Sequence, residues 1–337
     1  MFVRQLTYLV TLAQQRHFAR AAQACHVSQP ALSAAIQHLE DELGVSIVQR
    51  GQHFEGFTSE GERLLDWARR ILADWEGLRQ EATLSRNQLT GMLFLGAIPT
   101  TLPVVPLLTE PCLTAYPSVT HRVLSLSAEE IIRRIDHFEL DLGLTYLEDH
   151  VLRGFHMLPL YHERYVLLAR DASRIGDRTS LDWAEVADLP LCLLTPNMQN
   201  RRIIDAAFRR AGVTPKVCVE TDSIFALYSH VRSAGVFSVV PHSLLYLIEM
   251  RQEVTVIQVT PELSRSIGLI TLERKPLPPL VAATWSIFGD LDLQSRFDAL
   301  ISAIYWPIGQ NDRPNHLPAQ QGPTVSAETS SLLTRIK

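Results

Sequence analysis

The sequence predicts an all-α N-terminal part, then one long helix, then a large α/β region. Residues 4–43 repeat apolar side chains at helical spacing, and residues 58–89 keep such a repeat for several turns. From Gly91 onward, short apolar runs alternate with helical stretches, which is typical of a mostly parallel sheet covered by helices. At one domain per ~150 residues, a chain of 337 residues has room for two or three folding units.

We expect three short helices in the N-terminal part, at residues 4–15, 19–25 and 29–43. The third has the clearest start, because Ser28 is a good N-cap and Pro30 falls in the first turn, where its missing N–H costs nothing. Its apolar residues recur at spacings of four, three and four and form one core-facing stripe: Leu32, Ile36, Leu39 and Leu43. Small and polar residues share a different face, which we expect to be exposed and shallow: Gln29, Pro30, Ser33, Ala34 and Gln37.

A small wing and a long helix follow. Gly44 ends the third helix, and two short runs at residues 45–50 and 54–57, around Gly51, predict a two-stranded wing. The long helix has Thr58 or Ser59 as its cap, the latter in a capping box with Glu62. Its apolar residues alternate spacings of four and three, as a seam between two helices requires: Leu64, Ala68, Ile71, Trp75, Leu78 and Ala82. We expect this seam to join two chains, with packing on the chain's own C-terminal region as the alternative.

The α/β region offers nine apolar runs that predict strands, at residues 92–98, 121–126, 140–145, 165–168, 191–194, 217–220, 237–240, 254–258 and 267–272. Predicted helices lie at residues 102–115, 127–137, 199–211, 224–233 and 280–304. This spread is too great for one small sheet, so we expect two lobes. Residues 305–337 are rich in Pro, Gln, Ser and Thr and are expected to be disordered.

Hydroxyl and amide side chains follow several predicted strands. In a two-lobed α/β domain, a ligand lies between the lobes, outside the carboxyl ends of the strands. We therefore expect a cleft for a small molecule, such as a carboxylate or other small anion held at a helix N-terminus. For each residue alone, helix capping is the competing explanation. The candidate effector-binding residues are Thr100, Thr101, Ser125, Ser127, Thr145, Gln199 and Asn200.

Composition narrows the function classes. The net charge of −5 argues against wholesale basic binding to nucleic acid, so any DNA contact must be local. No run of about 20 uncharged apolar residues occurs, and the N-terminus does not resemble a secretory signal, so we expect a cytoplasmic protein without membrane contact. The usual phosphate, zinc and acyl-transfer motifs are missing, so we expect no enzyme, no cofactor and no metal. The cysteines lie far apart and are expected to be reduced thiols, with a Cys192–Cys218 redox switch as the alternative.

Several of these residues together closely resemble the N-terminal signature of LysR-type transcriptional regulators. They are residues 18–22 (Phe-Ala-Arg-Ala-Ala), residues 27–33 (Val-Ser-Gln-Pro-Ala-Leu-Ser), Ile36, Leu39, Glu40, Leu43, Gly44, Arg50, Thr58 and Gly61. The resemblance extends over about residues 1–304, through Tyr116-Pro117, residues 140–144, residues 188–190 and Pro241.

The resemblance implies a winged helix-turn-helix at residues 1–58, a dimerising linker helix at 59–90 and an effector-binding domain at 91–304. That domain would have two Rossmann-like lobes, as in periplasmic binding proteins, at residues 91–163 with 268–304 and at residues 164–267. It also implies homodimers or homotetramers that bind and bend promoter DNA, with RNA polymerase as a further partner. The DNA-binding residues would be Ser28, Gln29, Pro30, Ser33, Ala34, Gln37, Arg50 and His53.

Two positions depart from the family pattern. Many relatives carry a basic residue directly after the Val-Ser-Gln-Pro-Ala-Leu-Ser run and another three positions on, where this chain has Ala34 and Gln37. Fewer phosphate contacts predict weak half-site affinity and a shallow salt dependence. Two rival functions are a transport-like small-molecule-binding protein and an enzyme with an appended DNA-binding module. Residues 138–147 and 193–204 are similar to regulators found beside formate dehydrogenase operons.

Overall fold

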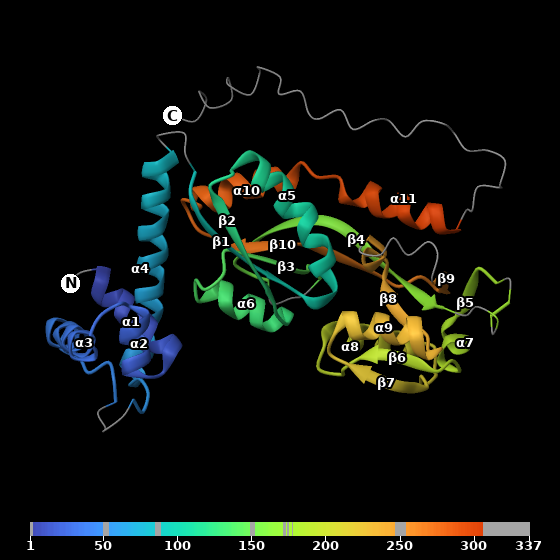
Figure 1. Ribbon diagram of the computed structural model, residues 1–337, viewed down its shortest axis with the longest axis horizontal. Coiled ribbons are helices and arrows are strands. Elements are labelled where there is room, and N and C mark those ends of the chain that lie inside the picture. The colour runs from blue at the N-terminus through green and yellow to red at the C-terminus, as the bar shows by residue number, and fades with distance from the viewer. Residues whose placement is uncertain are drawn as a thin grey trace, which may run out of the picture.

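The computed structural model describes residues 3–49, 54–84, 89–148, 152–170, 173, 175–176, 178–246 and 254–305. A small helical domain and a large α/β domain are joined by one long helix (Figure 1). This architecture agrees with the predicted fold class. The C-terminal segment expected to be disordered lies, from residue 306 onward, outside the described residues.

The N-terminal domain contains α1 (Val3–Gln15), α2 (Phe18–Ala24) and α3 (Gln29–Leu43). The Ser28 hydroxyl caps α3 by accepting a hydrogen bond from the Ala31 N–H at 3.4 Å, and Gly44 ends the helix at a φ of +67°. Leu32, Ile36 and Leu39 are buried as predicted, whereas Leu43 in the last turn is exposed. The apolar stripe therefore faces the core for three of its four residues.

The wing is reduced to one bridge among the described residues. Val48 pairs with Phe57, and the Gln49 N–H donates to the Gly56 carbonyl at 3.0 Å. The ring of Phe54 packs edge-on against Phe18 and Phe57, which holds the wing on α2. Residues 50–53, at the predicted wing tip, lie outside the described residues.

The linker helix α4 (Ser59–Leu84) begins after Thr58, whose hydroxyl accepts the Gly61 N–H at 2.9 Å. The alternative Ser59 capping box is not formed, because the Ser59 hydroxyl donates to the neighbouring Glu60 carboxylate. A side chain at Gly61 would collide with the Ile47 backbone, so glycine lets α4 start directly against the wing strand.

The α/β domain is built on an eight-stranded sheet in the order β2-β1-β3-β10-β4-β9-β5, with β8 also pairing with β4. A two-stranded sheet of β6 and β7 continues the second lobe, and a bridge from Leu191 to Phe237 connects it to β8. The strands are β1 (Gly91–Ala97), β2 (Val119–Ser125), β3 (Leu142–Tyr146), β4 (Phe155–Ala169), β5 (Ser180–Asp182), β6 (Leu191–Leu194), β7 (Val217–Thr221), β8 (Ser238–Pro241), β9 (Thr255–Thr260) and β10 (Ser264–Leu272).

Strand β4 connects the two lobes. Its residues 155–164 pair with β10, whereas residues 165–169 pair with β8 and β9. The sequence predicts only residues 165–168 as a strand, because the first half of β4 mixes His156, Pro159 and His162 with its apolar residues. The lobes therefore share a continuous, 15-residue strand.

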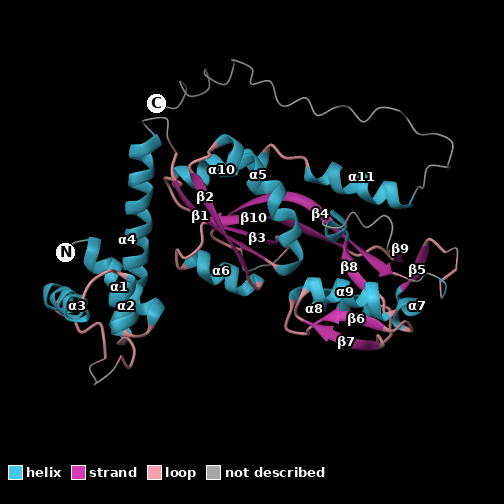
Figure 2. Ribbon diagram, viewed as in Figure 1, coloured by secondary structure: helices cyan, strands magenta, loops and turns pink. Residues whose placement is uncertain are grey.

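Helices cover the sheets of both lobes (Figure 2). In the first lobe α5 and α10 lie on one side of the sheet and α6 on the other, while α8 and α9 pack on β6 and β7 in the second (Figure 1). The helices are η1 (Pro99–Val104), α5 (Val105–Ala115), α6 (Ala128–Asp136), α7 (Trp183–Ala187), α8 (Gln199–Arg210), α9 (Ile224–Ala234), η3 (His242–Tyr246), α10 (Pro279–Gly289) and α11 (Leu293–Tyr305).

The predicted elements of the α/β domain are corrected in two places. The single helix expected at residues 280–304 is two helices, because the chain breaks after Gly289 and the Asp292 carboxylate accepts the Ser295 N–H to start α11. The predicted elements also omit β5 and α7, which are short; α7 begins with a reciprocal capping box between Asp182 and Glu185. In both places a helix begins at a capping aspartate, Asp292 or Asp182, within a stretch whose apolar residues show no clear periodicity.

Two features are absent from the described residues. No helix there is long and apolar enough to cross a membrane. No group of three or more His, Cys, Asp or Glu side chains in that part of the chain could hold a metal ion.

Candidate functional site

The start of α3 presents the predicted DNA-facing residues together. All six that the structure describes are exposed, on the side of the helix away from the buried Leu32 and Leu39: Ser28, Gln29, Pro30, Ser33, Ala34 and Gln37. Arg50 and His53 lie outside the described residues. The two glutamines, Gln29 and Gln37, are the bulkiest side chains of this face, so the face is shallow. Arg20, on the preceding α2, is also exposed and is not among the predicted DNA-facing residues.

Charge distinguishes the two ends of α3. Its first turn carries no acidic residue, whereas Glu40, Asp41 and Glu42 lie in the last turn. The Glu40 carboxylate accepts the N–H groups of Ile47 and Val48 at 2.6 and 2.9 Å, so it fixes the base of the wing. A polyanion is attracted to the N-terminal end of α3 and repelled from its C-terminal end.

A polar pocket of about 290 Å³ lies between the two lobes. Five of the seven candidate effector residues line it, contributed by both lobes: Thr100, Ser125, Ser127, Gln199 and Asn200. Tyr146, Asn197 and Asp222 also line it and were not predicted. An isolated Tyr or Asp carries no periodic signal, and only the fold brings these residues to the same place.

Two candidate residues do not line this pocket. Thr101 is fully buried, and its hydroxyl donates to the Ile98 carbonyl at 3.0 Å, which is a local bond of η1. Thr145 is buried within β3. Ser127 lines the pocket but also caps α6, because its hydroxyl accepts the Glu130 N–H at 3.2 Å. The capping explanation therefore applies to Ser127, whereas Met198, before α8, supplies no side-chain cap.

The pocket contains no basic side chain among its described lining residues, and Asp222 is its one acidic residue. Arg201, in the first turn of α8, is turned away and engaged. Its guanidinium donates to the Leu194 carbonyl and the Glu220 carboxylate, both at 2.7 Å, and to Asp205 at 2.9 Å. Hydroxyls and amides are thus the donors available to a ligand here.

A buried polar cluster lies beneath the pocket, where the lobes join. The Asn200 amide donates to the Tyr165 hydroxyl at 3.2 Å, and this hydroxyl lies 3.3 Å from that of Tyr146. The Ser243 hydroxyl donates to the Glu163 carboxyl at 3.1 Å. Burial raises the pKa of Glu163 to about 8, although nearby Ser243 and tyrosine hydroxyls oppose the rise. At neutral pH this carboxyl is mostly protonated, which avoids an unpaired buried charge.

The linker helix exposes a row of large apolar side chains. Ile71, Trp75 and Leu78 are 36%, 44% and 60% exposed, and Trp67, which was not predicted, is 61% exposed. Ala68 is only 1% exposed and belongs to the N-terminal core together with the half-buried Leu64. A buried side chain offers no surface to a second chain, so the large predicted seam residues that are exposed are Ile71, Trp75 and Leu78; the seam itself stays a prediction.

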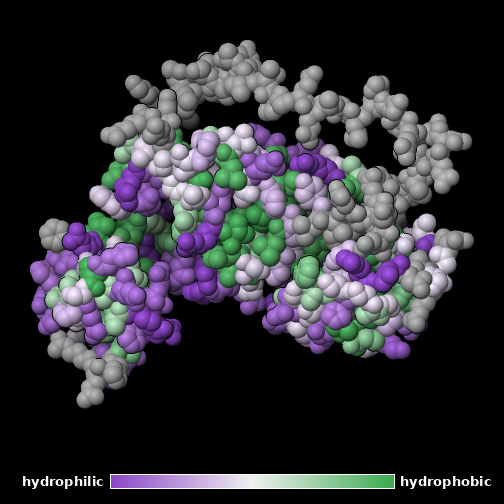
Figure 3. Space-filling model, in the orientation of Figure 1, coloured by the Kyte–Doolittle hydropathy of each residue, from purple (hydrophilic) through white to green (hydrophobic). Residues whose placement is uncertain are grey.

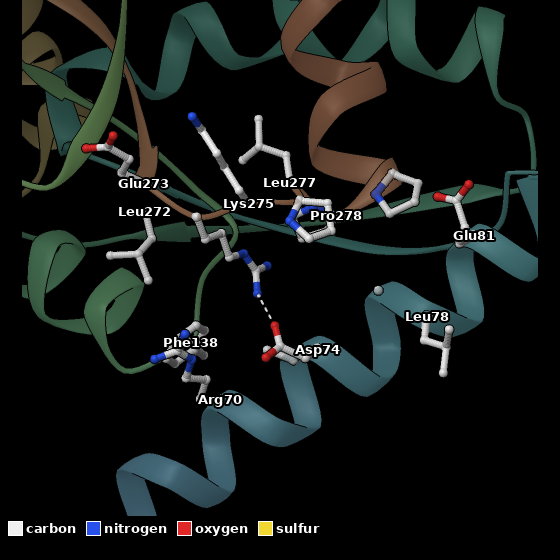
Figure 4. A pocket seen from close by; sticks show the side chains of 15 residues that line it. Arg70, Asp74, Leu78, Glu81, Phe138, Leu272, Glu273, Lys275, Leu277 and Pro278 are labelled. Atoms are coloured by element: carbon white, nitrogen blue, oxygen red, sulfur yellow. Dashed lines mark ion pairs between the residues drawn. The ribbon is translucent and has the colours of Figure 1, made fainter. Parts of the chain in front are cut away.

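Another side of α4 packs on the chain's own α/β domain. Arg69 pairs with Glu139 at 3.4 Å, Asp74 pairs with Arg274 at 3.5 Å, and the Gln80 side-chain carbonyl accepts the Leu280 N–H at 3.2 Å. Asp74 and Arg274 both line a cavity of about 920 Å³, which lies between α4 and the 272–279 segment, and Figure 4 shows the Asp74 carboxylate engaged in its ion pair. Leu78 belongs both to the exposed row and to the lining of this cavity, so the surface of α4 that packs on the α/β domain adjoins the exposed row.

The cysteines lie away from the polar pocket. Cys112 and Cys192 are buried, and burial raises the pKa of each thiol to about 11, so neither is a ready nucleophile. Cys218 is exposed on β7, and Cys25 is half-buried in the N-terminal domain. None of the described lining residues of the pocket is a cysteine.

A helical domain with a shallow exposed helix, a long connecting helix and a two-lobed domain around a polar pocket are the parts expected of a DNA-binding regulator with a ligand-binding domain. Family models agree with this class. The model described as "Bacterial regulatory helix-turn-helix protein, lysR family" matches residues 3–62, and "LysR substrate binding domain" matches residues 86–291. The chain belongs to the LysR family of DNA-binding transcriptional regulators, as the sequence resemblance predicts.

Individual relatives are also regulators. The chain is 29% identical to the DNA-binding transcriptional dual regulator OxyR of Escherichia coli K12 over 283 residues, which cover 82% of this chain and 91% of OxyR. It is 27% identical to the HTH-type transcriptional regulator EstR of Acinetobacter baylyi over 281 residues, covering 82% and 92% of the two chains. These names describe regulators of transcription and not enzymes, in agreement with the prediction.

Solved structures share the fold. A full-length OxyR variant from Pseudomonas aeruginosa superposes with a TM-score of 0.68 at 28% identity, covering 86% of this chain and 94% of that one. Full-length CbnR in complex with its target DNA superposes with a TM-score of 0.60 at 22% identity, covering 85% and 98%. The second likeness extends over both domains and concerns the fold alone.

Proposed function

We propose that this regulator reads promoter DNA with the start of α3. Gln29, Pro30 and Ser33 would enter the major groove, with Gln29 pairing with an adenine and Pro30 and Ala34 touching a thymine methyl group. Ser28, Arg50 and His53 would lie near phosphates, and Gln37 would border the groove. The observation that carries this proposal is the single exposed, shallow face that unites the six described residues. The acid-free first turn of α3 supports the same orientation.

A gel-shift assay with the DNA upstream of the protein's own gene tests this proposal. Parent protein should form a discrete complex, and Gln29→Ala should weaken it. Gln258→Ala is the matched control, because Gln258 is exposed on β9 in the second lobe, far along the chain from the DNA-reading helix. Equal affinity of the Gln29 variant and the parent, or no complex with the parent, would refute the assignment.

The polar pocket is the proposed effector site. Support comes from its position between the lobes and from its lining by five residues whose loops are far apart in sequence. Hydroxyl and amide donors suit a compact head group of low charge, such as a single carboxylate. Ligand bound there would favour one arrangement of the lobes and so change how the assembled protein bends DNA. A relative from Haemophilus influenzae is named "Hydrogen peroxide-inducible genes activator", but no described cysteine of this chain lines the pocket, so we propose reversible binding.

The domain division is proposed as residues 1–58, 59–90 and 91–304, the last with lobes at 91–163 plus 268–304 and at 164–267. The passage of β4 from one lobe to the other near residue 164 supports the lobe boundary. We further propose a homodimer joined through α4, assembled into a homotetramer, that contacts RNA polymerase. A regulator of promoters works beside chromosomal DNA, so a cytoplasmic location is part of the proposal.

A formate dehydrogenase operon is the proposed target. The support is the similarity of residues 138–147 and 193–204 to regulators found beside such operons; these stretches contain β3 and the start of α8, which both border the pocket. Footprinting on the upstream region of that operon in the same genome checks this. Protection no stronger than on unrelated DNA would remove the operon from the proposal and leave the DNA-reading surface untouched.

A further inference from the structure

A second cavity adjoins the polar pocket. It has a volume of about 750 Å³ and shares Pro99, Ser125 and Asp222 with the polar pocket. We call it the apolar groove. Its remaining lining comes from both lobes, at η1, β4, α9, β8 and η3: Leu102, Pro103, Leu168, Ser223, Ile224, Phe225, Leu227, Tyr228, Val240 and Leu244. The polar pocket and the apolar groove are thus two continuous parts of one cleft.

The groove is hydrophobic and open. Asp222, at its border with the polar pocket, is the one charged residue among the described residues that line it. Phe225 is 79% exposed there although it is a large aromatic side chain. Figure 3 shows more widely that hydrophobic side chains gather over the middle of the α/β domain. Exposed apolar surface of this kind is stabilised when an apolar group covers it.

A small molecule fits the groove better than a protein surface does. Ligand pockets of about 300–1,000 Å³ are concave, mostly apolar and supplied with a few polar groups, which matches the groove and the pocket beside it. A stable protein interface instead needs roughly 800 Å² of complementary surface on each partner. The groove adjoins the five hydrogen-bonding side chains of the polar pocket, so one ligand can contact both parts of the cleft.

We propose that the effector is an amphipathic small molecule, with one small hydrogen-bonding head in the polar pocket and an aromatic or aliphatic body in the apolar groove. This inference rests on the proposed effector function of the cleft and adds the ligand's chemical class. A bare anion such as acetate would leave the groove empty. Because no basic side chain is found among the described residues that line either part, the head is a single carboxylate or a neutral group and not a multiply charged one.

Calorimetric titration of the full chain with a homologous series tests the proposal. The probes are acetate, phenylacetate, 3-phenylpropanoate and 4-phenylbutanoate, with the corresponding alcohols as a second arm that distinguishes an anionic head from a neutral one. Acetate, which has no apolar body, should bind most weakly, and from phenylacetate to 4-phenylbutanoate affinity should rise roughly fourfold for each added methylene, as the transfer free energy of a buried CH₂ predicts. Equal affinity along both series, or binding by no member of either, would overturn the proposal.

Variants assign the effect to the groove. Phe225→Glu places a charge in the apolar part and should weaken 4-phenylbutanoate at least tenfold, with Phe225→Ala weakening it less. Because Phe225 is largely exposed, both variants should fold. Leu113→Glu is the matched control, since Leu113 is an exposed leucine of α5 outside the groove. Unchanged 4-phenylbutanoate affinity in both Phe225 variants would overturn the groove assignment.

Operator binding without any probe separates this inference from the proposed function. Parent and Phe225→Glu proteins should shift operator DNA equally, because the groove is remote from α3 in the chain. If affinity does not change with the chain length of the probe while operator binding is intact, the amphipathic ligand class is contradicted and the proposed function is not. A steep length dependence in a protein that fails to bind its operator supports the ligand class and contradicts the proposed regulation.

Discussion

The start of α3 and the pocket between the lobes are built in opposite ways. Six neighbouring residues, from Ser28 to Gln37, form the exposed face of α3, and one helical period places them together. The pocket instead takes Thr100, Ser127 and Asn200 from helix starts that are up to 100 residues apart in the chain. A local surface can therefore be predicted from spacing, whereas a non-local one depends on strand order that the sequence does not display.

Replacement of the buried acid beneath the pocket, Glu163, should give the largest change in stability. It tests the region that is built from segments far apart in the sequence. Glu163 has a folded-state pKa of about 8, above its usual 4.5, so the folded protein binds more protons across this range and its stability falls as pH rises from about 4.5 to 8. The loss is on the order of 5 kcal/mol, since each pKa unit corresponds to about 1.36 kcal/mol. Glu163→Gln should abolish this part of the slope.

Urea unfolding of both proteins between pH 5 and 8.5 measures this difference. Asp141 is also buried with a raised pKa, and His242 has a lowered one, but both titrate in parent and variant and cancel in the comparison. Parallel stability curves for parent and Glu163→Gln would show that the acid is ionised in the folded protein.

A change in the exposed row on α4 should have the next largest effect, on self-association. It tests a second surface that helical spacing predicts. Ile71→Asp should weaken self-association by more than tenfold, because burying each large apolar side chain of the seam contributes ~1.5–3 kcal/mol and an unpaired charge opposes it. Sedimentation equilibrium measures the dissociation. Glu62→Lys, in the exposed first turn of α4, is the control, and an Ile71 variant with the parent's oligomeric state would place the seam elsewhere.

Two variants distinguish a side chain that binds the ligand from one that only makes a local hydrogen bond within its helix. Gln199→Ala should weaken the thermal stabilisation by 4-phenylbutanoate several-fold, since a lost hydrogen bond is worth about 0.5–1.5 kcal/mol. Thr101→Val should keep that response and lose only a little stability, because the Thr101 hydroxyl bonds to Ile98 within η1. The reverse pattern would return Thr101 to the ligand site.

The smallest effect concerns salt. Gln37→Lys adds one cation to the DNA-facing side of α3, so a plot of log affinity against log salt should steepen by about 0.9 for one added phosphate contact. Gel shifts at several salt concentrations measure the slope. An unchanged slope would mean that residue 37 does not approach the DNA backbone.

The same contrast explains what the sequence could predict elsewhere. The β6 strand, Leu191–Leu194, was predicted at its observed bounds because an uninterrupted apolar run is a local signal. The first half of β4 was missed because polar residues and Pro159 interrupt the pattern, although pairing with β10 makes it a strand. Ala68 matched the seam period, yet its small side chain packs into the N-terminal core. Periodicity identifies an element's apolar faces but does not say which neighbour covers them.

The most direct test of DNA reading by α3 is selection of binding sites from a randomised operator library with parent and Gln29→Ala proteins. If Gln29 pairs with an adenine, the variant should lose preference at one base position in each half-site, at a cost on the order of 1–3 kcal/mol of discrimination. The other positions should keep their preferences. Identical selected sequences for the two proteins would contradict the assignment of the α3 face as the surface that reads the promoter.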